Sequence, residues 1–314
     1  MISIIYSTNR LDPKFEWFRD ALRQQVVNRG HEPVEVIVVD YVTPQPRFEP
    51  KIYPHFHITP KPSIYQGPDR KTKTEFFAPS NARNTGAIRS SGDYLVFVDD
   101  VSIPMPGWWN AVCEAAESRR IVCGAYQKHF EMAVESGRLL KSRPGGIDSR
   151  WSQGNDSGPV KIQGSQLFGC SFGIPYSDFI TVNGFDEICD SIGGEDYHLG
   201  LRLMFAGKQL WYDRRMLTIE SEELHNQPYL MKRDDRVLPD KQYMDKLNSF
   251  GVKNRLMPGN WDSSHMILDV LYGKKSTWTV GNEYTLSDQR KWETMPAMSK
   301  PDRHWFDDKL LSEL

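Results

Sequence analysis

The segments Ile2-Ser3-Ile4-Ile5-Tyr6 and Val34-Glu35-Val36-Ile37-Val38-Val39 lie on either side of a helical pattern near the start of the chain. Both segments are short, apolar and rich in β-branched residues, which is typical of buried strands. Over residues 14–27 the apolar side chains recur at helical spacing and share one side, namely Phe15, Phe18, Leu22 and Val26. Strand, helix and strand at this spacing form a βαβ unit, which predicts an α/β fold with a parallel sheet.

Polar residues follow both strands at the point where each strand ends. Thr8, Asn9 and Arg10 come after the first strand, and Asp40 comes after the second. Ligands of parallel sheets bind beyond the carboxyl ends of the strands, so we expect these four residues on the ligand-binding edge. There Arg10 suits an anionic pyrophosphate and Asp40 suits a base or ribose. The alternatives are that Arg10 is an ordinary exposed arginine and that Asp40 is a turn residue at the end of the strand.

A third predicted strand, residues 93–98, ends in the acidic pair Asp99-Asp100. Adjacent carboxylates at such an edge are costly unless a cation or water neutralises them. Mn²⁺ and Mg²⁺ take oxygen ligands and often bridge to phosphates. We therefore expect one aspartate to face a divalent metal and its neighbour to face the ribose of a nucleotide. A solvated pair of loop aspartates is the alternative.

A second acidic pair occurs about a hundred residues later, in Gly193-Gly194-Glu195-Asp196. The two glycines permit a tight bend, and residues 197–205 continue with apolar side chains at helical spacing. The pattern predicts two carboxylates at a helix N-terminus, where either is a candidate general base. A charged N-terminus on an ordinary core helix is the alternative.

Two further residues are candidates for the same site. Arg83 lies near the start of a helix predicted over residues 80–90, where the positive helix end favours an anionic pyrophosphate. His225 follows the last predicted strand, and imidazole suits Mn²⁺ as a further ligand. The alternative for Arg83 is an ordinary exposed arginine. The alternative for His225 is a surface histidine or one whose hydrogen bonds are satisfied within the protein.

The remaining elements are predicted more coarsely. Residues 41–79 contain eight prolines and cannot form one regular element, so we expect a functional or mobile loop. Residues 127–166 are polar and glycine-rich, which predicts a flexible loop or an inserted subregion. Helices are predicted over residues 107–117, 176–182 and 232–246, and strands over residues 120–126, 167–174, 209–212 and 216–219.

The composition fits one large α/β domain or two smaller ones. The chain has 314 residues, 39% hydrophobic and 12% aromatic, and its net charge of −2 argues against a general nucleic-acid or membrane-surface binder. Its four cysteines show no metal-ligand spacing, which predicts reduced thiols in a cytoplasmic protein. We expect no signal peptide and no stable membrane insertion, because there is no basic leader and no apolar run of about 20 residues.

Four segments, in this order, resemble those of inverting nucleotide-sugar glycosyltransferases of the GT-A fold, family 2 type. They are the first strand running into Thr8-Asn9-Arg10, then Asn81-Ala82-Arg83-Asn84-Thr85-Gly86, Phe97-Val98-Asp99-Asp100, and Gly193-Gly194-Glu195-Asp196 with its leucine-rich helix. The resemblance covers residues 1–226 and implies a catalytic domain with a Rossmann-like, mostly parallel sheet flanked by helices. Residues 227–314 are then expected to form a C-terminal extension that packs on it.

The resemblance implies a nucleotide-sugar donor, with a UDP-sugar favoured, and Mn²⁺ or Mg²⁺ at the first acidic pair. Galactosyltransferase-type relatives carry a similar Gly-Gly-Glu-Asp segment. Their pattern implies that Asp196 is the base, that Glu195 orients the acceptor or sugar, and that His225 binds the metal. We favour Asp100 as the second metal ligand and assign the nucleotide to Thr8, Asn9, Arg10, Asp40, Arg83 and Asp99.

Three departures from the family pattern alter these expectations. The usual Asp-x-Asp would place an aspartate at position 101, where Val101 stands. Tyr41 follows Asp40 in place of a second acid, so recognition of the base is expected to include ring stacking. Ile192 replaces the tryptophan that precedes Gly-Gly-Glu-Asp in galactosyltransferase-type relatives. This departure weakens the inference that this chain acts on the same acceptor as they do.

The sequence therefore predicts a metal-dependent inverting glycosyltransferase acting on an acceptor hydroxyl. A saccharide is the favoured acceptor, with modified nucleic acid ranked low. A non-catalytic nucleotide- or sugar-binding module on the same scaffold is the alternative from another class. A sugar nucleotidyltransferase ranks lower, because Ser7-Thr8-Asn9-Arg10 lacks the glycine-rich basic loop usual in such enzymes.

Overall fold

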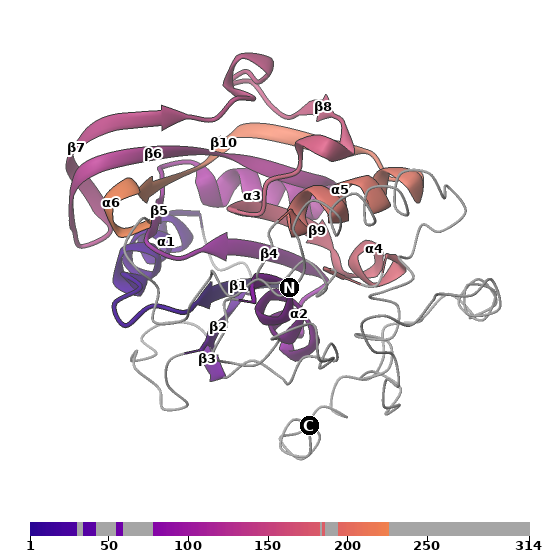
Figure 1. The fold of residues 1–314 in the computed structure, drawn as a ribbon, viewed down its shortest axis with the longest axis horizontal. Coiled ribbons are helices and arrows are strands. Elements are labelled where there is room, and N and C mark those ends of the chain that lie inside the picture. Colours follow the sequence, from indigo (N-terminus) through magenta and orange to yellow (C-terminus); the bar gives the residue numbers. More distant parts are fainter. Residues whose placement is uncertain (30–33, 42–54, 59–77, 183, 186–193, 226–314) are drawn as a thin grey trace, which may run out of the picture.

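The computed structural model describes residues 1–29, 34–41, 55–58, 78–182, 184–185 and 194–225. Within them the strands form one sheet in the order β3-β2-β1-β4-β9-β6-β10-β5, with β7 added to β6 and β8 added to β10 (Figure 1). The strands are β1 Ile2–Thr8, β2 Val34–Asp40, β3 His55–Ile58, β4 Tyr94–Asp99, β5 Ser102–Pro104, β6 Ile121–Glu135, β7 Arg138–Ile147, β8 Val160–Ile162, β9 Ser171–Pro175 and β10 Leu210–Ser221. The helices are α1 Phe15–Arg29, α2 Pro79–Arg89, α3 Trp108–Glu117, α4 Tyr176–Thr181, α5 Glu195–Phe205 and α6 Glu222–His225, with short 3₁₀ turns η1 Trp151–Gln153 and η2 Gly164–Gln166.

The predicted βαβ unit is confirmed. β1 pairs in parallel with β2, from Ile2 opposite Val34 to Thr8 opposite Asp40, and β1 also pairs in parallel with β4. This register brings the carboxyl ends of all three strands to one edge. The sheet as a whole is mixed, because β9 runs antiparallel between β4 and β6. The α/β class is therefore as predicted, while the expected parallel order holds for the first half of the sheet and for the β6–β10 pair.

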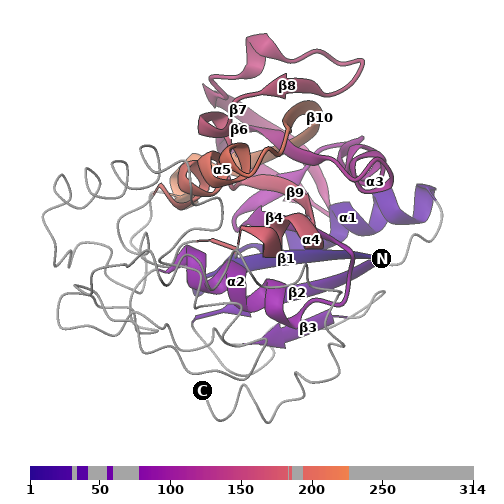
Figure 2. The same ribbon diagram turned by 90° about the vertical axis from the view of Figure 1, so that its right-hand side faces the viewer.

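Helices cover both faces of the sheet (Figure 2). On one face α1 and α3 pack on alternate side chains of β1, β2 and β4, around Tyr6, Phe15, Phe18 and Trp108. On the other face α2, α4 and α5 pack around Phe97, Phe172, Phe179 and Phe185. Two buried aromatic clusters therefore clamp the central strands from both sides, which fixes the strand ends that carry the polar residues.

Of the two alternatives predicted for residues 127–166, a flexible loop or an inserted subregion, the flexible loop is wrong. β6 runs on to Glu135 and returns as β7, and the two pair antiparallel up to Glu135 opposite Arg138. Ser136 and Gly137 form the two-residue turn with φ of 47° and 73°, the combination that a tight type I′ hairpin requires. The dipeptide Ser136-Gly137 between alternating side chains was the available signal. Polarity misled the prediction, because this hairpin exposes one face to solvent.

The tip of the hairpin packs on α1. The side-chain amide of Gln24 donates to the carbonyl of Ser136, and Arg138 Nε donates to Gln24 Oε1 at 3.3 Å. A Cβ at Gly137 would lie 2.3 Å from the backbone nitrogen of Ala21. The absence of a side chain at this glycine is therefore needed both for the turn and for the contact with α1.

Gly137→Ala is expected to lower the free energy of unfolding by about 1–2 kcal/mol, because alanine must adopt a left-handed conformation against backbone. Urea denaturation measures the change. Gly146→Ala on β7 is the matched control, since a Cβ there meets no atom within 4 Å and φ is not positive. Equal stability of the two variants would contradict the assigned role of the turn.

The remaining predicted elements agree with the structure in most places. The helices expected over residues 14–27, 80–90, 107–117 and 176–182 are present as α1, α2, α3 and α4. The two strands expected after residue 209 are one strand, β10, with an irregularity between Asp213 and Thr218. Cys113, Cys123 and Cys170 are free thiols.

Several predictions fall outside the described residues, namely Cys189, the helix over 232–246 and the C-terminal extension over 227–314. Within the described residues no helix is long and apolar enough to cross a membrane.

Candidate functional site

A pocket of about 170 Å³ opens at the carboxyl ends of β1 and β4. It is also bordered by the start of α2, the start of α5 and the end of α6. Among its lining residues are most of the predicted site residues, namely Thr8, Asn9, Arg10, Arg83, Asp99, Asp100, Glu195 and His225. Asp40 and Asp196 are not part of the lining. Residues far apart in the sequence thus meet where the strand order predicts a ligand.

Arg83 joins the two acidic pairs. Its Nη2 donates to Asp99 Oδ1 at 2.8 Å and its Nη1 donates to Glu195 Oε1 at 2.7 Å. The guanidinium also lies over the ring of Phe185, 5.2 Å from its centroid. The side chain is only 6% exposed, so both bonds form in a poorly solvated setting. The two carboxylates hold the pKa of Arg83 above its ordinary value against the effect of burial.

Asp196 has a different environment from Glu195, although both begin α5 after the left-handed Gly194 with φ of 83°. Its Oδ2 accepts from the backbone N–H of Gly169 at 3.1 Å, and its Oδ1 accepts from the N–H of Tyr197 at 2.7 Å. Burial, and next the charge of Glu195, raise the pKa of Asp196 to about 6. A carboxylate with that pKa is ionised at neutral pH and is still basic enough to take a proton.

Asp100 is held by residues of the first strand end. Its Oδ2 accepts from the hydroxyl of Thr8 at 2.7 Å, and its Oδ1 accepts from Arg10 Nε at 3.1 Å. Burial raises the pKa of Asp100 to about 6, although Arg10 and Thr8 act in the opposite direction. Asp100 therefore sits in the pocket as a buried acid with one cationic partner.

Arg10 also fixes α6, the helix that carries His225. Its Nη1 donates to the carbonyl of Leu224 at 2.6 Å and its Nη2 to the carbonyl of His225 at 3.2 Å. His225 Nδ1 is hydrogen-bonded to Glu220 Oε1, which lies at the end of β10. The predicted position of His225 beside the acidic pair therefore depends on Arg10 and Glu220.

The donor chemistry of the pocket suits a hard divalent cation. Carboxylates of Asp99, Asp100 and Glu220 line it together with the imidazole of His225. Because Glu220 engages Nδ1, Nε2 is the nitrogen that His225 would offer, the arrangement usual for metal-binding histidines. No group of three or more such side chains that could hold a metal occurs among the described residues. The types of side chain that line the pocket therefore fit a divalent cation. These side chains do not converge on one point in the structure.

Asp40 and Tyr41, which were predicted to contact the nucleotide, form hydrogen bonds within the protein. Asp40 is fully buried, and its Oδ2 lies 3.0 Å from Nε2 of His57 on β3. Tyr41 lines the pocket and its hydroxyl donates to the carbonyl of Ala78 at 2.6 Å, which anchors the ring beside the start of α2. The structure therefore brings Tyr41 rather than Asp40 to the pocket wall.

Val101 explains the departure from Asp-x-Asp. It adopts φ of 50°, which is strained for a β-branched residue, and its side chain is fully buried. Its N–H donates to the carbonyl of Pro13 and its carbonyl accepts from the N–H of Ser221. Position 101 thus serves the core and pins three segments together, so it offers no side chain to the pocket.

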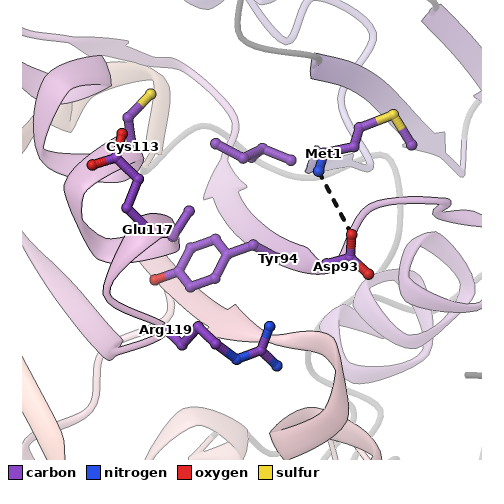
Figure 3. Close-up of a pocket in the computed structure, with 8 residues that line it drawn as sticks. Met1, Asp93, Tyr94, Cys113, Glu117 and Arg119 are labelled. Carbon is purple, nitrogen blue, oxygen red and sulfur yellow. Dashed lines mark ion pairs between the residues drawn. The ribbon is translucent and has the colours of Figure 1, made fainter. Parts of the chain in front are cut away.

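Sequence reasoning missed Gly169 and Glu220, which contact the predicted acid Asp196 and the predicted ligand His225. Neither carried a local signal, because each acts through a partner distant in the sequence. A second cavity of about 190 Å³ lies at the opposite ends of β1 and β4, around Asp93, Tyr94 and Cys113 (Figure 3). Asp93, Glu117 and Arg119 also line it, but none of the predicted site residues does.

Comparisons with known protein families give two matches. A family model described as glycosyl transferase family 2 matches residues 16–176, about half of the chain. A model described as the N-terminal domain of galactosyltransferase matches residues 150–219, which include the start of α5. Among curated proteins, no significant match was found.

Solved structures resemble the chain in fold. A crystal structure of GalNAc-T7 with UDP, GalNAc and Mn²⁺ gives a TM-score of 0.53 at 12% identity, covering 93% of this chain and 53% of that one. A crystal structure of S. aureus TarS 1-349 in complex with UDP gives 0.51 at 11% identity, covering 93% and 77%. The chain thus spans about half the length of the GalNAc-T7 chain that it matches.

Proposed function

We propose that this chain, which belongs to glycosyl transferase family 2, transfers a sugar from a nucleotide-sugar to an acceptor hydroxyl with inversion at the sugar carbon. Membership confirms the predicted family, and the solved structures confirm the GT-A fold. One observation carries the proposal. The ends of β1 and β4 and the start of α5 bring Asp99, Asp100 and Glu195 to one pocket, where Arg83 joins Asp99 to Glu195.

Asp196 is the base in this proposal. Glu195 forms an ion pair with Arg83 at 2.7 Å, whereas Asp196 accepts hydrogen bonds from the backbone N–H groups of Gly169 and Tyr197, and burial raises its pKa to about 6. Two neighbouring carboxylates in such different environments divide the roles of ionised orienting group and proton acceptor. Asp196 takes the proton of the acceptor hydroxyl as that oxygen bonds to the sugar carbon and the bond from this carbon to the nucleoside diphosphate breaks. Glu195 orients the acceptor or sugar.

The nucleotide is proposed to bind along the ends of β1 and β4. Thr8, Asn9, Arg10 and Asp99 line that wall, and Tyr41 supplies a ring for stacking on the base. The side-chain nitrogen of Asn9 is buried with no hydrogen-bond partner among the described residues, which suits a ligand acceptor atom. Arg83 adds a buried positive charge facing the diphosphate. UDP is favoured as the nucleotide because the GalNAc-T7 and TarS structures both contain it.

Mn²⁺ or Mg²⁺ is proposed as the cofactor, since the similar GalNAc-T7 structure contains Mn²⁺. Asp100 and His225 would hold the ion, with Glu220 fixing the imidazole through Nδ1. When bound, the ion would supply positive charge that stabilises the leaving diphosphate. Arg10 and Thr8 keep Asp100 in place for this role.

One observation favours the alternative of a non-catalytic nucleotide-binding module. Asp99, Asp100 and Glu195 are each already paired with an arginine, Arg10 or Arg83, so each of these carboxylates has a cationic partner without a metal. Such a module would bind a nucleotide-sugar and release it unchanged.

For the proposed enzyme, a saccharide remains the favoured acceptor.

Calorimetry of the full chain with UDP, GDP, CDP and dTDP, each with Mn²⁺ or with EDTA, tests the proposal. UDP is expected to bind only with Mn²⁺, and Asp100→Ala is expected to weaken that binding by at least about 10-fold. Asp156→Ala is the control, because Asp156 is an exposed aspartate that does not line the pocket.

Metal-independent binding of UDP would remove the metal from the proposal. Binding of UDP-sugars without transfer to any acceptor or to water would support the binding module instead.

A further inference from the structure

The segment between η2 and β9 contacts both Asp196 at the start of α5 and the buried Arg83. Gly169 lies at its centre and touches both. Its backbone N–H donates to Asp196 Oδ2 at 3.1 Å. A Cβ built on Gly169 would lie 2.9 Å from Arg83 Nη2, 3.1 Å from Cζ and 3.3 Å from Nη1. The guanidinium thus rests directly against the backbone of Gly169, in a space that no other residue type leaves open.

The segment is itself rigidly held, so Gly169 has little freedom to move away. Next to it, the ring of Phe168 packs under the guanidinium of Arg150, 4.2 Å from the ring centroid. Arg150 is fully buried, bonded through two nitrogens to Asp148, and donates to the carbonyls of Gln166 and Gly124. On the other side, the carbonyl of Cys170 accepts from the N–H of Asp99 at 3.4 Å. The backbone position of Gly169 is therefore set by β4, β6 and the buried Asp148–Arg150 pair.

The groups around Asp196 act on its pKa in both directions. Glu195 raises its pKa by repulsion, after burial, while Arg83 and the N–H groups of Gly169 and Tyr197 lower it. The thiol of Cys123 on β6 also interacts electrostatically with this carboxylate. Three groups therefore lower the pKa of Asp196. They are the N–H of Gly169, the guanidinium of Arg83, which packs against Gly169, and the N–H of Tyr197.

We infer that Gly169 is a positioning residue for the proposed reaction, acting at once on the base Asp196 and on Arg83. Its N–H holds one carboxylate oxygen, and its missing side chain leaves room for the guanidinium to reach Glu195 and Asp99. The inference rests on the proposed function for its consequence in catalysis, while the geometry stands on its own. A methyl group at position 169 must displace Arg83 or the segment, and either change leaves the ionised form of Asp196 less stabilised.

The direct test is the titration of Asp196 in the full chain, followed by ¹³C NMR of labelled aspartate carboxyls and assigned with Asp196→Asn. In Gly169→Ala the pKa of Asp196 is expected to rise by about one pH unit. The acid limb of the kcat profile is expected to move upward by the same amount. Gly146→Ala, where a Cβ meets no atom within 4 Å, is the control and is expected to leave both unchanged. An Asp196 titration in Gly169→Ala that coincides with the wild type would overturn the inference.

A double variant guards against a folding failure of Gly169→Ala. Arg83→Ala removes the group that the new methyl would meet, so Gly169→Ala in that background is expected to fold and to add little further shift. A further rise as large as in the wild-type background would show that Gly169 does not act through Arg83 and would refute the coupling. If the wild-type protein transfers no sugar, the proposed function fails, whereas the titration still decides the role of Gly169.

Discussion

Asp196→Asn is expected to lower kcat for sugar transfer by about 10²–10⁴-fold while leaving the Kd for the donor nucleotide nearly unchanged. The amide keeps the shape of the side chain and accepts the N–H of Gly169 or Tyr197, but it cannot take a proton from the acceptor. The wild-type rate is expected to fall about tenfold per pH unit below pH 6, because the base must be ionised and its pKa is about 6. The variant should lose this limb. Initial rates over pH 4–9 with a UDP-sugar provide the measurement.

The control for this experiment is Asp156→Asn, which changes an aspartate that is 82% exposed and pairs with Arg214. It is expected to keep the wild-type rate and profile. Unchanged turnover in Asp196→Asn would remove Asp196 from the mechanism. Glu195 would then be the remaining acidic candidate at the start of α5.

Arg83→Met is expected to lower the free energy of unfolding by about 3 kcal/mol and to abolish transfer. The substitution keeps an apolar stem of similar length but leaves Glu195, whose side chain is 12% exposed, without its cation. Removing one partner from a buried ion pair typically costs about 3–5 kcal/mol, and the partial exposure of Asp99 places this case at the lower end. Urea denaturation and UDP calorimetry measure the two effects.

Arg143→Met is the matched control. Arg143 also pairs with a glutamate, Glu131, but both side chains are more than half exposed, so the expected loss is below about 1 kcal/mol. A loss in Arg83→Met no larger than in Arg143→Met would show that the bridge between the acidic pairs contributes little to the fold.

The strand ends of the site were predictable because they follow from local pattern. Apolar runs at β1, β2 and β4 and the helical spacing of α1 determine the parallel unit, and that unit determines where Thr8, Arg10 and Asp99 lie. Burial of one face makes such periodicity strong. The motif around Glu195 was readable for the same reason, since two glycines and two acids before an apolar helix leave few structural choices.

The partners of those residues were not predictable from local pattern. Arg83 sits near a helix start, yet its contacts lie 16 and 112 residues away, and spacing along the chain carries no information about them. Gly169 acts through its backbone and through an absent side chain, which no composition rule detects. The hairpin was missed because its outer face is polar, although Ser136-Gly137 carried the turn signal.

The hydrogen bonds from Arg10 to the carbonyls of Leu224 and His225 on α6 have a consequence for biosynthesis. Arg10 is made early, but the two carbonyls that it binds belong to residues 214 and 215 positions later. At about 5–20 residues per second, a ribosome needs roughly 10–40 s to cover that distance. The β1–β2 unit has its full sequence long before then, whereas the wall that carries His225 does not yet exist. A nascent or truncated chain lacking α6 can therefore fold its first strands without acquiring a complete pocket, so incomplete translation products should carry no donor-binding competence.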